Sequence, residues 1–300
     1  PIPAYLLAIA VGNLYFAEIG DDTGVYAEPE LLDASAFEFA DTQAMFETAE
    51  AMFGPYRWGR YDLLILPPSF PYGGMENPRL SFLTPSLLAG DRSLVAVVAH
   101  ELAHSWSGNL VTNQTWRDGW LNEGWTSYLE YRLMQVIYDE DRANEENLIS
   151  YEELLLNFET IDPRYQALAP RDEDLDPEEG QGTIAYHKGN QFLQYLENTN
   201  ARETYDRYIT ENYYEFAFQD NTTEHFDHYL DHREDRYRTD DLVAGLTRIV
   251  HGLVKKFAIG TAVWHLYTAL GGPDVWENLA TTSSLTGCIV YIKPGAICID

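Results

Sequence analysis

The stretch His100-Glu101-Leu102-Ala103-His104 is the one from which the fold can be inferred. On an α-helix, residues four apart lie on one face, so His100 and His104 can offer two imidazoles to one cation, with Glu101 beside them. The apolar run Ser93–Ala99 leads directly into this stretch and predicts a buried helix. The pattern H-E-x-x-H on a helix indicates a zinc site in which the glutamate is the general base. A helix face with a chance glutamate between two histidines is the alternative.

A third candidate ligand, Glu123, follows His104 after eighteen residues. It precedes the amphipathic run Trp125–Tyr131, so it can project from a second helix toward the first. Two histidines and one carboxylate leave a fourth coordination position open for water, which is typical of a catalytic rather than a structural zinc. We therefore expect one Zn²⁺ per chain, held by His100, His104 and Glu123.

A second motif, Tyr72-Gly73-Gly74-Met75-Glu76-Asn77, lies ahead of the histidines. With both motifs, G-x-M-E-N and H-E-x-x-H-x18-E, the chain resembles the gluzincin zinc aminopeptidases. The nearest likeness is to the branch of aminopeptidase B and the leukotriene epoxide hydrolase/aminopeptidase. Segments 67–72, 84–91 and 107–113 share it, and it extends from Pro1 to about Leu230. The resemblance implies an α+β fold, a thermolysin-like catalytic domain with a small mixed sheet lobe and a mainly helical lobe.

The second motif suggests how a peptide would bind. Gly73 and Gly74 carry no side chains, so the backbone there can approach an extended peptide and pair with it like a sheet edge. A carboxylate at Glu76 would pair with a free α-ammonium, because a longer peptide would bury its amide against an unpaired charge. The resemblance assigns this role to Glu76 and adds Tyr72 and Met75 as substrate-binding candidates. From the residues alone, a Gly-Gly turn with a solvated glutamate is the alternative.

Two further candidates come from the resemblance. The match of Tyr186-His187-Lys188-Gly189 to Tyr-x-Lys-Gly makes Tyr186 the tyrosine that donates a hydrogen bond to the developing oxyanion. Glu178, a substrate-binding candidate, stands where the branch has an aspartate, and Gln181 stands where the epoxide hydrolase has a second tyrosine. These two departures disfavour epoxide hydrolysis.

Composition excludes some partners. The formal net charge of −29 over 300 residues would repel nucleic acid and anionic membranes. The resemblance implies peptides with a free amino terminus as partners. Oligomeric state is open, with a monomer favoured.

Cys288 and Cys298 do not indicate a redox compartment, and no run of 18 apolar residues is present. A soluble, cytoplasmic protein is favoured for localisation, with the periplasm and secretion left open.

The chain is expected to divide into three parts. Residues 1–14 would end a truncated β-rich domain, 15–240 would form the catalytic domain, and 241–300 match nothing in the family and stay unassigned. Strands are predicted at Tyr5–Val11 and Tyr61–Leu66, and a helix is predicted at Tyr151–Phe158. One long helix is predicted after Ser35 through Phe53, with Phe37, Ala40, Ala44, Met45 and Ala49 on its inner face.

Three further histidines raise the question of a second metal site. His225, His228 and His232 share a helix face, but the charged residues between them favour a solvated face over a second metal site.

The leading hypothesis is a zinc aminopeptidase with Glu101 as general base and Tyr186 at the oxyanion. The alternatives are a bifunctional epoxide hydrolase/aminopeptidase, a thermolysin-like endopeptidase and an inactive zinc-binding fragment.

Overall fold

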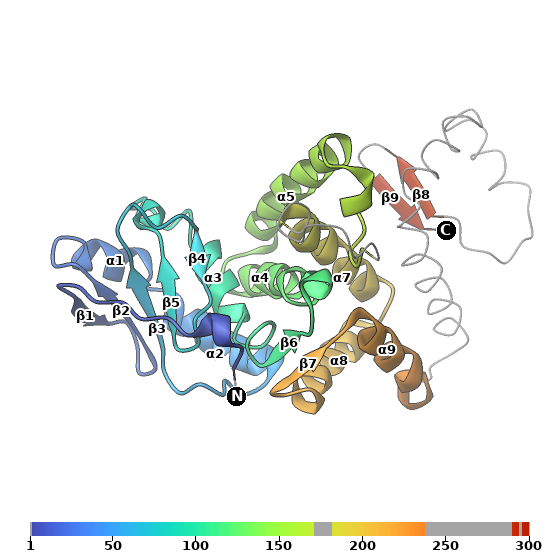
Figure 1. Ribbon diagram of the computed structural model, residues 1–300, viewed down its shortest axis with the longest axis horizontal. Coiled ribbons are helices and arrows are strands. Elements are labelled where there is room, and N and C mark those ends of the chain that lie inside the picture. The colour runs from blue at the N-terminus through green and yellow to red at the C-terminus, as the bar shows by residue number, and fades with distance from the viewer. Residues whose placement is uncertain (1, 171–181, 238–289, 294–295, 300) are drawn as a thin grey trace, which may run out of the picture. The chain divides into compact units, whose positions relative to one another are not determined.

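The computed structural model describes residues 2–170, 182–237, 290–293 and 296–299. The chain divides into two compact units, residues 1–247 and residues 248–300. The described part of the second unit is an antiparallel hairpin of β8 (Val290–Lys293) and β9 (Ala296–Ile299). All other described elements belong to the first unit (Figure 1).

A mixed five-stranded sheet forms the amino-terminal part of the first unit (Figure 1). Its strands are β1 (Tyr15–Glu18), β2 (Thr23–Ala27), β3 (Tyr61–Ile65), β4 (Gly74–Met75) and β5 (Leu80–Leu83), in the order β1-β2-β3-β5-β4. β2, β3 and β5 are parallel, whereas β1 and β4 run antiparallel to their neighbours. All of β3 is buried, as expected for a central parallel strand, and it confirms the strand predicted there. The short β4 is an edge strand.

Two helices, α1 (Leu32–Glu38) and α2 (Thr42–Phe53), pack against this sheet, where one long helix was predicted. The prediction was wrong because Glu38 is buried and anchors the chain at the break. Its carboxylate accepts hydrogen bonds from the backbone N–H groups of Gly90 and Arg92, at 2.7 and 2.8 Å. Met45 and Ala49 lie on the inner face as predicted, while three other residues assigned to that face are exposed: Phe37, Ala40 and Ala44.

The predicted strand at residues 5–11 is also wrong. The segment contains the short 3-10 helix η1 (Ala4–Leu6) and then an irregular stretch in which Leu7, Ile9 and Val11 are exposed. An apolar run satisfies the strand pattern locally, but a strand needs a neighbour to take its backbone hydrogen bonds. No described strand pairs with this segment.

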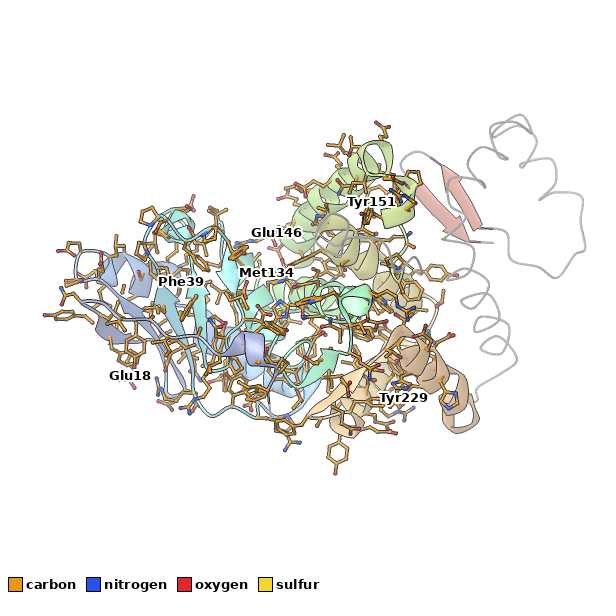
Figure 2. The ribbon with its side chains drawn as sticks, viewed as in Figure 1. Glu18, Phe39, Met134, Glu146, Tyr151 and Tyr229 are labelled. Atoms are coloured by element: carbon orange, nitrogen blue, oxygen red, sulfur yellow. The ribbon has the colours of Figure 1, made fainter. Side chains whose placement is uncertain are left out.

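The rest of the first unit is mainly helical and surrounds α4 (Glu123–Ile137), which packs against α2, α3, α5 and α7. The buried side chains of α4 include Tyr128, Leu133 and Met134, the last of which is labelled in Figure 2. The other helices are α3 (Ala96–Ala103), α5 (Glu140–Thr160), α7 (Gly189–Asn198), α8 (Arg202–Glu215) and α9 (Thr223–Tyr237), with the π-helical turn η5 (Ile184–Lys188) and the 3-10 helices η2 (Pro85–Leu87), η3 (Trp116–Leu121) and η4 (Pro163–Tyr165). β6 (Val111–Asn113) and β7 (Gln219–Asn221) form a parallel pair. α5 contains the helix predicted at 151–158.

A buried ion-pair network fixes α4 to its neighbours. Arg132 is almost fully buried, and its guanidinium lies 3.2 Å from Glu197 on α7 and 2.7 Å from Asp206 on α8. The same guanidinium donates a hydrogen bond to the hydroxyl of Tyr128 at 2.6 Å. Arg132 is the cation shared by carboxylates from α7 and α8, so its side chain links three helices.

The α+β fold class is confirmed by the mixed sheet and the helical part. None of the described helices is long and apolar enough to span a bilayer. His225 and His228 lie on α9, but neither belongs to a described group of side chains close enough to share a metal. The side chain of His232, Cys288 and the apolar segment 242–266 lie outside the described residues.

Candidate metal centre and active site

His100 and His104 approach one point from the end of α3, with ring centroids 4.8 Å apart. Each ring has a partner for its Nδ1 atom. His100 Nδ1 lies 2.9 Å from a carboxylate oxygen of Glu130, and His104 Nδ1 lies 3.0 Å from the carbonyl oxygen of Ser107. Such contacts fix the orientation of a metal-binding imidazole and leave Nε2 free to coordinate.

Glu123, the first residue of α4, completes the group. Its Oε2 atom lies 3.4 Å from His100 Nε2 and 3.3 Å from His104 Nε2. Ligand atoms placed tetrahedrally at roughly 2.0 to 2.1 Å from a zinc ion lie about 3.3 to 3.4 Å from one another. Glu123 Oε2 is also buried without a hydrogen-bond partner. The donor atoms and their spacing therefore fit a four-coordinate zinc with one position left for water.

The charges around the two imidazoles also favour a cation. Burial opposes protonation of His104, but the charges of Glu123 and Glu76 raise its pKa to about 9. Burial likewise opposes protonation of His100, yet contacts with Glu123 and Glu130 raise its pKa well above the usual value. Burial disfavours the charged form of Glu123 as well, but the two histidines hold the pKa of its carboxyl below the usual range. The carboxylates around the two imidazoles therefore favour positive charge at this point.

Two more carboxylates lie at the same centre. Glu101 on α3 is 6 % exposed, and burial raises the pKa of its carboxyl to about 7. Glu76 follows β4 and is 8 % exposed. One ligand atom each from Glu76, Glu101 and His104 lies within 4.8 Å of the others. The side-chain amide of Asn109 donates a hydrogen bond to the backbone carbonyl of Glu76 at 2.8 Å, which fixes the chain at this point.

The edge strand β4 passes directly beside the general-base candidate. A side chain on Gly74 would collide with the carboxylate of Glu101 and would have to displace it. The carbonyl of Gly73 accepts a hydrogen bond from the backbone N–H of Thr84. β4 thus brings unobstructed backbone to the metal centre.

Tyr186 reaches the centre from the π-helical turn η5. Its ring is stacked on that of His100, with centroids 5.6 Å apart and planes 9° from parallel. Burial, and then the charge of Glu123, raise the pKa of the phenol above its usual value. The hydroxyl therefore stays protonated at neutral pH and can act as a hydrogen-bond donor. π-Helical turns are frequent at functional sites.

Known proteins resemble this chain over most of its length. Residues 37–249 match the Peptidase family M1 domain, which is more than half of the chain. The chain belongs to peptidase family M1. It is 46 % identical over 233 residues to leukotriene A-4 hydrolase of Xenopus laevis, and 42 % identical over 231 residues to leucine aminopeptidase 2-1 of Meyerozyma guilliermondii. The matches cover 77 % and 75 % of this chain.

Solved structures confirm the M1 catalytic fold. The structure of yeast LTA4 hydrolase in complex with bestatin matches 79 % of this chain at 41 % identity with a TM-score of 0.76. Native leukotriene A4 hydrolase of Saccharomyces cerevisiae matches 81 % at 40 % identity with the same TM-score. This M1 chain spans only 38 % to 39 % of the length of these relatives. Peptidases of the M1 family are in general zinc enzymes.

Not every predicted residue of the M1 site meets the metal centre in this structure. Tyr72 is 63 % exposed, and its described ring contact is with Phe70. Met75 is partly buried and pairs with Phe82 of β5. Glu178 lies outside the described residues.

The structure also places residues beside the candidate metal centre that the motifs did not reveal. Glu130 contacts His100, and the hydroxyl of Thr126 lies 3.1 Å from His104 Nδ1. Glu130 stands seven residues after Glu123, two turns along one helix face, so the helical period could have revealed it. Thr126 stands three residues after Glu123 on the same face. By contrast, the carbonyl of Ser107 could not be found from the sequence, because the turn that presents it depends on Gly108 at φ 104°.

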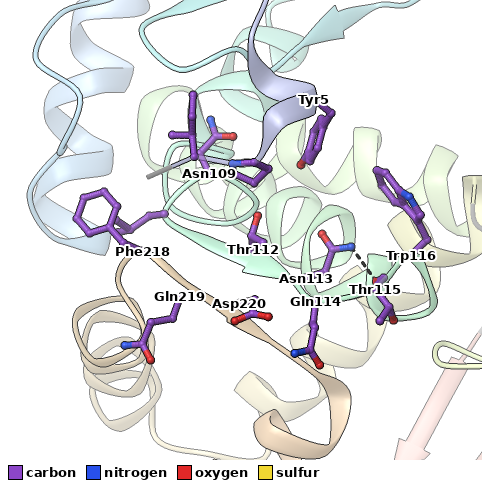
Figure 3. Close-up of a pocket in the computed structure, with 13 residues that line it drawn as sticks. Tyr5, Asn109, Thr112, Asn113, Gln114, Thr115, Trp116, Phe218, Gln219 and Asp220 are labelled. Carbon is purple, nitrogen blue, oxygen red and sulfur yellow. Dashed lines mark hydrogen bonds between the residues drawn. The ribbon is translucent and has the colours of Figure 1, made fainter.

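A cavity of about 440 Å³ lies beside η1, β6 and β7 of this M1 chain (Figure 3). Aromatic and amide side chains line it, among them Tyr5, Asn109 and Trp116. The rings of Tyr5 and Trp116, which both line the cavity, lie 5.7 Å apart. His100, His104 and Glu123 are not among its lining residues, whereas Asn109 lines it and also donates a hydrogen bond to the backbone of Glu76.

Proposed function

We propose that this chain is the catalytic part of a zinc aminopeptidase, which removes the amino-terminal residue of a peptide. The observation that carries the proposal is the position of Glu76, whose buried carboxylate lies within reach of both Glu101 and His104. A positively charged α-amino group next to the scissile bond would neutralise this carboxylate. A blocked or internal amide would leave it unpaired at a large cost.

His100, His104 and Glu123 would hold the zinc, with their orientation maintained by Glu130 and the carbonyl of Ser107. Bound zinc supplies Lewis acidity to a water molecule and to the scissile carbonyl.

Glu101 is proposed as the general base. It lies one residue after a zinc ligand, and burial raises the pKa of its carboxyl to about 7. A base with a pKa near the working pH accepts a proton from water efficiently and can then pass it to the leaving amine. Its Oε2 atom is buried without a hydrogen-bond partner, so it is available to the reacting water.

Tyr186 is proposed to donate a hydrogen bond to the oxyanion that develops on the carbonyl. Its stacking on His100 brings the phenol close to the ligand set, and its raised pKa keeps the proton on the oxygen. A donor aimed at developing charge in a water-poor site stabilises the transition state more than the bound substrate. The Gly73–Met75 backbone at the sheet edge would align the peptide, with a free amino terminus toward Glu76.

The direct test compares an aminoacyl p-nitroanilide that has a free amine with its N-acetylated counterpart, using zinc-loaded protein. An aminopeptidase hydrolyses only the first. Hydrolysis of both would instead support a thermolysin-like endopeptidase, and hydrolysis of neither by protein that binds zinc would indicate an inactive fragment.

A second candidate activity is epoxide hydrolysis, which is favoured by the 46 % identity to a protein named leukotriene A-4 hydrolase. The two sequence departures at Glu178 and Gln181 disfavour it, and both positions lie outside the described residues. Incubation with a fatty-acid epoxide, followed by chromatographic detection of a diol, distinguishes the bifunctional enzyme from a pure peptidase.

A further inference from the structure

Two glycines touch where α4 begins and α7 begins. A Cβ atom built on Gly124 would lie 2.8 Å from the Cα atom of Gly189 and 2.8 Å from the carbonyl oxygen of Ala185. A Cβ atom built on Gly189 would lie 2.7 Å from the Cα atom of Gly124. All three neighbours are backbone atoms, which cannot rotate away as a flexible side chain would. The two helices are therefore in backbone contact at this point.

This contact does not arise from an unusual backbone conformation. Gly189 adopts φ −61° and ψ −49°, ordinary helical values, and neither glycine is among the described residues with positive φ. Glycine is a poor helix former compared with alanine, so the sequence places an unfavourable residue at both facing positions. Close approach of the two backbones is the physical reason for glycine at these positions.

The contact joins two parts of the proposed site. Gly124 directly follows the ligand Glu123, and Gly189 directly follows the turn η5 that carries Tyr186. We propose that Gly124 and Gly189 are positioning residues, whose backbone contact sets the placement of the Tyr186 hydroxyl against the metal centre. This inference rests on the proposed function in so far as it concerns the rate.

The size of the effect follows from the contact distances. An ordinary carbon contact begins near 3.4 Å, so a methyl group at 2.7 to 2.8 Å forces the two backbones apart by about 0.6 Å. A displacement of about 1 Å at a reacting centre can cost on the order of 100-fold in rate. We expect Gly189→Ala to lower kcat by about 10-fold to 100-fold and to change KM little, because Tyr186 acts mainly in the transition state.

Gly182→Ala is the matched control. Gly182 lies on the helical residues that lead into η5, and a Cβ atom there would meet nothing within 4 Å. The Gly182→Ala change adds the same methyl group to the same segment without a clash, so kcat should stay at the parent value. Zinc content should equal the parent's in both variants, because no proposed ligand is replaced. Loss of zinc in Gly189→Ala would overturn the inference, since the methyl group would then act through Glu123, which precedes Gly124.

A double-mutant cycle shows whether Gly189 acts through Tyr186. In a Tyr186→Phe background, Gly189→Ala should lower kcat by less than about twofold, because the group that it displaces is already gone. An equal loss in both backgrounds would overturn the inference, since the methyl group would then act by another route.

A spectroscopic measurement tests the placement without turnover. 3-Fluorotyrosine introduced at position 186 reports its surroundings through its ¹⁹F resonance. Zinc addition should shift this resonance strongly in the parent and in Gly182→Ala, but clearly less in Gly189→Ala. Equal shifts in all three proteins would overturn the inference. If the parent hydrolyses neither test substrate, the aminopeptidase proposal fails, whereas this comparison still decides whether the contact positions Tyr186.

Gly124→Ala provides a second variant, because it inserts a methyl group into the same contact from the other helix. Its effect and that of Gly189→Ala should not add, since either methyl group opens the same gap. Additive losses of kcat would contradict a shared contact. Absence of a cooperative thermal transition in both single variants would overturn the inference, because the contact would then maintain the fold as a whole.

Discussion

Replacement of Glu76 by alanine is the change that most sharply separates an aminopeptidase from other zinc hydrolases. The Glu76 side chain is 8 % exposed, so water screens its charge weakly, and its backbone is held by Asn109. Truncating one partner of such a buried, charged hydrogen bond costs on the order of 2 to 5 kcal/mol. At about 1.4 kcal/mol for each factor of ten, kcat/KM for a free-amine substrate should fall by roughly 30-fold to 4,000-fold.

The assay measures kcat/KM for an aminoacyl p-nitroanilide and for its N-acetylated form in the parent, Glu76→Ala and Glu76→Gln. Gln keeps the size and one acceptor oxygen, and charge-assisted hydrogen bonds are about twice as strong as neutral ones, so it should lose about half of the free energy lost by Ala. The free-over-acetylated preference should collapse in Glu76→Ala while zinc content stays constant. If both the rate and the preference survive in Glu76→Ala, the amine is recognised elsewhere and the reasoning is refuted.

Glu101→Gln should keep zinc but lose on the order of 10²- to 10⁴-fold in kcat, because an amide cannot accept the proton of water; a parent-like rate would remove Glu101 from the mechanism. A His100→Ala/His104→Ala double variant should bind no zinc by elemental analysis, whereas the parent should hold about one ion. Glu130→Ala should weaken zinc binding by about 10-fold to 100-fold in a chelator competition, because His100 loses its Nδ1 partner. Apparent zinc affinity should fall as the pH drops below about 9, because zinc needs neutral imidazoles and the pKa of His104 is raised to about 9. Calorimetry in two buffers should detect the release of protons on zinc binding. A zinc affinity that does not change with pH would contradict these pKa shifts.

Much of the site was accessible from the sequence because its signals are local. The i, i+4 spacing of His100 and His104 follows from the helical period alone, and a buried helix does carry them. The approach of Glu123 needed only a second helix, which α4 supplies. The buried strand β3 was equally readable, since an apolar run ended by two prolines has few other interpretations.

The errors come from partners that are distant in the chain. The break between α1 and α2 depends on Glu38, whose carboxylate bonds to the backbone more than fifty residues later. Leu7, Ile9 and Val11 form a strand-like pattern, yet no described strand lies beside them. The contact between Gly124 and Gly189 likewise joins two segments whose proximity no local period encodes.

The π-helical turn that carries Tyr186 makes this part of the chain sensitive to the loss of a single residue. A π turn holds one residue more than an α turn, so deleting one residue between Tyr186 and Gly189 would restore α-helical winding. The wider turn takes up the extra residue without changing the register of the helix beyond it, so the deletion would redirect the side chains within the turn, including that of Tyr186. A one-residue gap in this turn is therefore a more severe change than most substitutions. Among homologous chains, the residue count between the tyrosine and the glycine is as informative as the residues themselves.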